Sequence, residues 1–211
     1  EKESIRVFIP DLPGFKEETK TERPWSLDDY IYWLKNFIEK EKKAERLKEP
    51  FFLLGHSFGG RVAIKFCAQN LSKIEGLVLV SSAGIKPKKK IISRFAPFLK
   101  KFAFLPGFYF FRKIFYKFII RKTDYLNAKG ELKETFKKVI DEDLLFFLSE
   151  IKIPTLILWG EKDKITPLSN AYLMKEKIKG SKLEILKGLS HVPYLENPEL
   201  LAGKILDFIK R

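Results

Sequence analysis

Residues 51–67 read FFLLGHSFGGRVAIKFC: an apolar run, a Gly-x-Ser-x-Gly motif and a stretch of helical character. Strand, motif and helix in this order predict a sharp strand-to-helix turn that carries Ser57. In such a turn the hydroxyl is exposed at the carboxyl edge of a sheet, and the following helix directs its first backbone N–H groups at the same place. Flanking glycines let the turn tighten. The stretch therefore predicts an α/β fold with a serine nucleophile.

A serine hydroxyl needs a base that removes its proton during attack, and histidine suits that role near neutral pH. The chain holds two histidines, His56 and His191. His56 immediately precedes Ser57, and on a strand that enters the turn its side chain points away from the serine Oγ. His191 follows the alternating stretch 183–186 and lies in a loop at the end of a predicted strand. We therefore expect His191 to be the base.

The base needs an acid that holds its tautomer. Asp163 follows the buried apolar run 154–159 and is the best candidate, with Glu161 a weaker one in the same loop. Asp11, at the end of another predicted strand, is a third. An alternative role for Asp163 is to cap the helix that begins near Pro167.

Strand and helix signals alternate along the chain, which predicts a mostly parallel sheet with helices on both faces. The expected strands are near 4–10, 51–55, 76–81, 154–159 and 182–187, and the expected helices are near 26–43, from Gly59 onward, 167–179 and 197–210. We expect a core formed by 1–84 and 151–211. Residues 85–150 are then an inserted helical cap.

The first part of the insert is strongly basic. Residues 86–122 hold twelve Lys or Arg, eleven Phe or Tyr and no acidic residue, in a chain of net charge +14. One interpretation is a lid whose apolar face covers an acyl pocket; another is a lid that also docks on anionic membrane. Nucleic-acid binding is a weaker alternative, because no nucleic-acid motif accompanies the charge. The uncharged run 102–111 is too short for a transmembrane helix.

Cysteine and histidine are too few for common metal sites. The single cysteine, Cys67, falls on the helix behind Ser57 and has no intrachain disulfide partner. No Cys or His spacing indicates a metal ligand set, so we expect neither metal nor cofactor. A reducing cytoplasm fits this composition.

Three segments together resemble the signature segments of capped serine hydrolases of the α/β-hydrolase superfamily. They are 55–60 (GHSFGG), 160–167 (GEKDKITP) and 190–198 (SHVPYLENP). The most similar branch contains carboxylesterases and C–C bond hydrolases. The resemblance covers the whole chain apart from the cap.

The resemblance implies Ser57 as nucleophile, Asp163 as acid and His191 as base, and the backbone N–H of Phe58 as one oxyanion donor. Family members begin with further strands and a loop that supplies a second oxyanion donor. Here residues 5–11 resemble the family's fourth strand, so we expect a fragment of a longer protein that lacks this donor. Loss of one such donor typically costs ~10²–10³ in rate.

The leading functional hypothesis is hydrolysis of a carboxylic ester or thioester through an acyl-enzyme, with a small-molecule acyl or aromatic ester as the substrate. One alternative is cleavage of a C–C bond, which an arginine in the pocket would favour; Arg61 and Arg94 are candidates. Another alternative is a non-catalytic module that binds a lipid surface or a protein.

Overall fold

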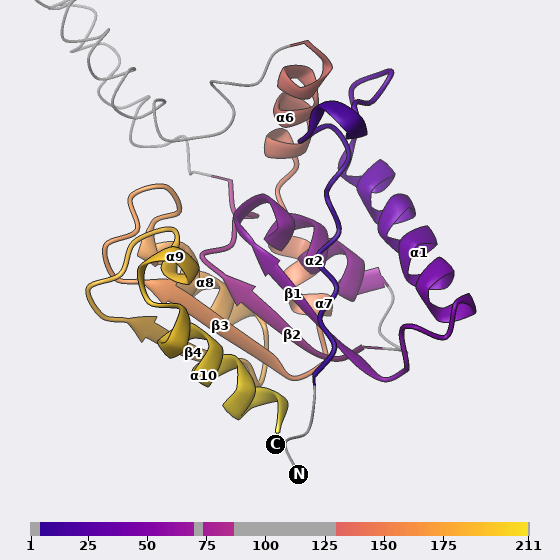
Figure 1. Ribbon diagram of the computed structural model, residues 1–211. Coiled ribbons are helices and arrows are strands. Elements are labelled where there is room, and N and C mark those ends of the chain that lie inside the picture. The colour runs from indigo at the N-terminus through magenta and orange to yellow at the C-terminus, as the bar shows by residue number, and fades with distance from the viewer. Residues whose placement is uncertain (1–4, 70–73, 87–129, 211) are drawn as a thin grey trace, which may run out of the picture.

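The computed structural model describes residues 5–69, 74–86 and 130–210 (Figure 1). The helices in these ranges are η1 (Glu17–Thr19), α1 (Leu27–Lys43), α2 (Ser57–Gln69), α6 (Glu131–Asp141), α7 (Leu145–Glu150), α8 (Leu168–Lys177), α9 (Pro193–Glu196) and α10 (Pro198–Ile209). The strands are β1 (Phe51–His56), β2 (Ile74–Val80), β3 (Thr155–Gly160) and β4 (Lys182–Leu186).

The four strands form one parallel sheet in the order β1-β2-β3-β4. Leu54 pairs with Val78, and Leu79 pairs with Ile157, so the ends of β1, β2 and β3 lie side by side. Because the strands are parallel, the loops that follow them meet at the same edge of the sheet. The predicted parallel α/β arrangement is confirmed.

The inner strand β2 is buried on both of its faces. Leu77 and Leu79 belong to the larger core, which α1, α2, α7 and α8 also line. Val78 and Val80 point to the other face and pack in a smaller core with Leu201 of α10. Alternate residues of a strand face opposite sides, so a strand that is apolar throughout is buried on both of them.

The predicted strand near 4–10 is wrong. Residues 5–12 have no strand structure, and Val7 and Ile9 are 69% and 88% exposed. A strand needs a neighbour with which to form a hydrogen-bonded ladder, and in the described part of the chain β1 pairs only with β2. The segment is tied down instead through Arg6, whose Nη1 donates to the carbonyl of Arg46 at 2.7 Å.

The chain between β2 and β3 is described in part. Of the predicted insert, the described residues 130–150 contain α6 and α7. Residues 87–129 lie outside the described ranges. They include almost all of the basic, aromatic stretch, so both lid hypotheses concern residues that the structure does not describe. The boundary of the cap at 85–150 stays a prediction.

Two further observations concern the thiol of Cys67 and the length of the helices. Cys67 is fully buried on α2, and burial raises the pKa of its thiol. None of the helices in the described ranges combines the length and the apolar character that crossing a bilayer requires.

Candidate active site

The turn between β1 and α2 holds Ser57 in a left-handed conformation with φ +49°. A Cβ on Gly55 would lie 2.7 Å from the carbonyl oxygen of Gly59, and one on Gly60 would collide with Ser82 Oγ. The space around Gly59 is open instead. Close approach of α2 to the strands therefore requires glycine at positions 55 and 60. Gly59, the second glycine of the Gly-x-Ser-x-Gly motif, has room for a side chain.

The structure brings His191 to the serine. Ser57 Oγ and His191 Nε2 are 2.9 Å apart, and His191 is 8% exposed. The loop that carries the histidine packs on the end of β3, where a Cβ on Gly160 would collide with the carbonyl of Ser190. A glycine at the end of β3 thus lets the histidine loop approach the serine.

Asp163 completes the constellation. Its Oδ2 lies 2.8 Å from His191 Nδ1, and its side chain is fully buried. Its Oδ1 accepts hydrogen bonds from the backbone N–H groups of Ile165 (2.8 Å) and Thr166 (2.9 Å). Burial alone would raise the pKa of this carboxyl, but the hydrogen bonds from His191, Thr166 and the backbone outweigh it and lower the pKa to about 2.

These contacts fix the protons. An ionised carboxylate can only accept hydrogen bonds, so His191 Nδ1 carries a proton and donates it to Asp163. In the neutral ring Nε2 is then unprotonated and accepts from the hydroxyl of Ser57. The arrangement can move a proton from the serine to the histidine while the aspartate stabilises the imidazolium that forms.

Thr166 is a part of the site that sequence reasoning missed. Its buried hydroxyl lies 2.7 Å from Asp163 Oδ2 and 3.3 Å from His191 Nδ1. Its backbone is held by Trp159, whose Nε1 donates to the Thr166 carbonyl at 3.0 Å. The signal was an Asp followed three residues later by Thr, a pattern in which the carboxylate accepts from nearby backbone N–H groups.

The rival acids have other partners. Glu161 accepts from the backbone N–H of Gly188 at 2.8 Å, so it supports the histidine loop from outside the site. Asp11 is half exposed and pairs with Lys16 at 2.7 Å. Asp163 does not cap α8, which begins at Leu168 without a side-chain cap.

Phe58 is the second residue of α2, so its backbone N–H is among the helix's first four, which have no acceptor within the helix. Its ring makes edge contacts with Phe15 (5.0 Å between centroids), Tyr30 (5.2 Å) and Phe136 (5.4 Å). Residues from the N-terminal loop, α1 and α6 thus form an aromatic wall around the turn. Its role as an oxyanion donor stays a prediction.

Arg61 is buried and forms hydrogen bonds within the protein. It is 4% exposed, and its Nη2 donates to the carbonyls of Val139 (2.6 Å), Ile140 (3.3 Å) and Glu142 at the end of α6. The guanidinium therefore anchors α6 to α2, and this contradicts the expectation that it could hold a substrate carboxylate. Arg94 lies outside the described residues.

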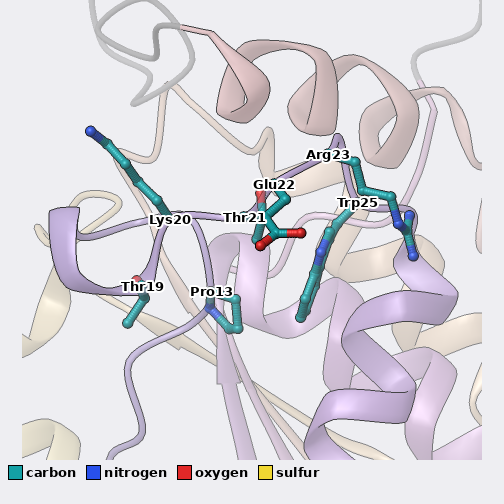
Figure 2. Close-up of a pocket in the computed structure, with 7 residues that line it drawn as sticks. All are labelled: Pro13, Thr19, Lys20, Thr21, Glu22, Arg23 and Trp25. Carbon is teal, nitrogen blue, oxygen red and sulfur yellow. The ribbon is translucent and has the colours of Figure 1, made fainter.

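A hollow of about 640 Å³ lies on the loop between η1 and α1. Trp25 lines it and contacts Tyr30 of the aromatic wall, with ring centroids 5.1 Å apart. Figure 2 shows its lining, with Lys20 and Arg23 reaching outward in opposite directions. No residue of the Ser57–His191–Asp163 constellation lines it. Within the described ranges, no group of three His, Cys, Asp or Glu side chains is placed to hold a metal ion.

Comparisons with known proteins show which family the chain resembles. A model of the alpha/beta hydrolase family matches residues 1–204. The chain is 25% identical over 240 residues to the monoacylglycerol lipase ABHD6 of Mus musculus, covering 98% of this chain and 68% of that protein. It is 26% identical over 216 residues to Lipase 1 of Psychrobacter immobilis, covering 92% and 65%.

Among solved structures, the esterase EaEST from Exiguobacterium antarcticum superposes with a TM-score of 0.69 at 20% identity, covering 95% of this chain and 80% of the esterase. At that identity the likeness shows the fold alone. The chain spans about two thirds of the length of the curated relatives that it matches.

Proposed function

Because the chain belongs to the alpha/beta hydrolase family, we propose that it is a serine hydrolase that cleaves a carboxylic ester or thioester through an acyl-enzyme. One observation carries the proposal: Ser57 Oγ, His191 and Asp163 are joined by contacts of 2.9 and 2.8 Å at the carboxyl edge of the sheet. A serine paired with a histidine, and a histidine paired with a buried carboxylate, form the arrangement that activates a hydroxyl.

In the acylation step, Ser57 Oγ attacks the carbonyl carbon while its proton passes to His191 Nε2. The carbonyl oxygen becomes an oxyanion beside the backbone N–H of Phe58, at the N-terminus of α2 where the helix dipole favours negative charge. When the C–O or C–S bond breaks, His191 returns the proton to the leaving group. The acyl group then remains on Ser57.

Deacylation repeats these steps with water as the nucleophile. His191 Nε2 takes a proton from the water as its oxygen attacks the acyl carbon, and then gives that proton to Ser57 Oγ as the acid is released. Asp163, ionised throughout because of its low pKa, stabilises the imidazolium in both halves.

The surroundings of Ser57 and the relatives support one class of substrate. Phe15, Phe58 and Phe136 place aromatic surface beside the turn, which favours an apolar acyl or aromatic group over a charged one. Two relatives are named as lipases, one of them for monoacylglycerol. These points support an ester of an apolar acyl or aromatic acid as the first substrate to test.

The test is hydrolysis of p-nitrophenyl esters of graded acyl length by the wild-type chain, Ser57→Ala and Ser149→Ala. Ser149 is an exposed serine on α7 and serves as the matched control. We expect turnover by the wild type and Ser149→Ala, and none above background for Ser57→Ala. Equal turnover by all three proteins, or none by a folded wild type, would contradict the proposal.

The basic stretch 86–122 motivates a separate proposal, peripheral binding to anionic membrane. Its test is co-sedimentation with vesicles of phosphatidylserine against vesicles of phosphatidylcholine. Binding to the anionic vesicles by a Ser57→Ala protein, together with an absence of ester turnover by the wild type, would favour the non-catalytic alternative.

A further inference from the structure

His56, the residue directly before the nucleophile, makes a long-range contact with the base. Its Nε2 lies 2.8 Å from the backbone carbonyl oxygen of His191, 135 residues away in the chain. The two rings are also adjacent, with centroids 4.9 Å apart. The contact therefore joins the end of β1 to the loop that follows β4.

The chemistry of this contact fixes its direction. A carbonyl oxygen has no proton, so the bond forms only if His56 Nε2 carries the proton and donates it. His191 needs the opposite arrangement, with its proton on Nδ1 facing Asp163 and an unprotonated Nε2 facing Ser57. As neutral rings, the two histidines of the chain thus carry their protons on opposite nitrogens.

The position of the bond suggests what it does. His56 and Ser57 are consecutive residues, at the end of β1 and the start of α2. A hydrogen bond from His56 to the backbone of His191 therefore holds the base at a fixed distance from the nucleophile. The rings of His56 and Tyr194 of α9 also make an edge contact, with centroids 5.1 Å apart, which supports the imidazole.

The other supports of the histidine loop lie further from the reacting atoms. Glu161 holds the backbone of Gly188, and Glu196 accepts from the backbone N–H of Ser190 at 2.6 Å, both at exposed positions. The hydrogen bond from His56, by contrast, is made to the backbone of His191 itself. Small displacements of a base cost rate steeply, because proton transfer requires hydrogen-bond distance.

We propose that His56 is a positioning residue, which holds the base His191 at the nucleophile by a hydrogen bond from its Nε2–H to the His191 carbonyl. The inference rests on the proposed serine hydrolase function. His56 takes no proton from the substrate or from Ser57; it acts through the placement of His191.

The kinetic test compares His56→Gln with His56→Leu. The amide nitrogen of Gln can occupy the place of the imidazole Nε2 and donate the same bond, whereas Leu cannot. We expect kcat of His56→Leu to fall about tenfold, which converts to ~1.4 kcal/mol, with KM changed by less than about twofold, and His56→Gln to recover most of the loss. Leu195→Ala, an exposed change on α9, should leave kcat unchanged.

A spectroscopic test does not depend on turnover. In ¹⁵N-labelled protein the nitrogen shifts of the two imidazoles report their tautomers, and His56→Gln assigns them. We expect a proton on Nε2 of His56 and on Nδ1 of His191. In the folded His56→Leu protein, whose melting temperature is measured alongside, we expect the His191 Nδ1–H signal to exchange faster with water.

The outcomes separate the two proposals. A folded wild type that hydrolyses no ester refutes the proposed function, whatever the tautomers are. An active wild type whose His56→Leu variant keeps full kcat, or whose His56 carries its proton on Nδ1, overturns the positioning role alone. Equal losses of kcat in the Gln and Leu variants would also overturn it, since they would assign the effect to ring packing.

Discussion

The replacement Asp163→Asn tests whether the carboxylate sets the tautomer of His191. Asn has nearly the same shape, but one oxygen becomes an NH₂ group. The backbone N–H groups of Ile165 and Thr166 can only donate, so the amide oxygen must take the place of Oδ1. The NH₂ group then faces His191 Nδ1 from the place of Oδ2, 2.8 Å away.

The consequence for His191 can be worked out from these partners. An NH₂ group facing Nδ1 must donate to it, so the imidazole proton moves to Nε2, which then cannot accept the proton of Ser57. Thr166 can turn its hydroxyl to the carbonyl of Ser81, 3.2 Å away, so every group still finds a partner and the fold should survive. A wrong tautomer of this kind lowers kcat by ~10⁴, or ~5.5 kcal/mol.

The assay is steady-state ester hydrolysis with a melting curve for each protein. Asp207→Asn, an exposed change on α10, is the matched control and should behave as the wild type. We expect Asp163→Asn to fold, to bind substrate with a similar KM and to lose nearly all of its kcat. A folded Asp163→Asn protein whose kcat stays within tenfold of the wild type would refute the reasoning.

Four further predictions concern the same neighbourhood. Thr166→Val removes one bond to the carboxylate and keeps the packing; it should cost ~1 kcal/mol of stability in chemical denaturation and raise the pKa of Asp163. Gly160→Ala should destabilise by about 1–3 kcal/mol, because its Cβ meets the backbone of Ser190, whereas Gly59→Ala, in open space, should be neutral or slightly stabilising in the same melts. Ser81→Ala should cost less than ~0.5 kcal/mol, since the buried Ser81 Oγ has no hydrogen-bond partner in the described part of the chain; a clear loss in a urea titration would show that the hydroxyl has one. The depressed pKa of Asp163, about 2 against 3.8, stabilises the fold above about pH 4, and this contribution disappears as the pH falls through 2; acid titrations should therefore show up to about 2 kcal/mol less pH dependence in Asp163→Asn than in the wild type.

The sequence predicts the sheet well where burial alone decides the structure. The apolar runs at β2 and β3 are buried on both faces, so neither strand depends on a fine balance of partners. The residues at 5–10 have equally strand-like character, but a strand also depends on which backbone lies beside it, and composition does not contain that information. This explains why Val7 and Ile9 are exposed.

In the site, too, some features could be predicted from the sequence and others depend on tertiary contacts. Ser57, Asp163 and His191 could be selected from the sequence because each follows an expected strand and the chemistry demands those residue types; the structure brings them within hydrogen-bond distance. The contacts of Thr166 and His56 depend on tertiary distances between loops. Arg61 was a candidate to bind a substrate carboxylate because it lies close to Ser57 in the sequence. Its burial against the end of α6 instead gives it a structural role, and that contact depends on tertiary structure.

The proposed function requires Ser57 to be an activated nucleophile, and reaction with a fluorophosphonate probe measures this property of the serine. The wild type, Ser57→Ala and Ser149→Ala would be treated with the probe, digested and mapped by mass spectrometry. We expect a phosphonyl adduct on Ser57 in the wild type and in Ser149→Ala, and no adduct in Ser57→Ala. An adduct at another residue, or an unmodified Ser57 in a protein whose melting curve shows it to be folded, would contradict the proposed function.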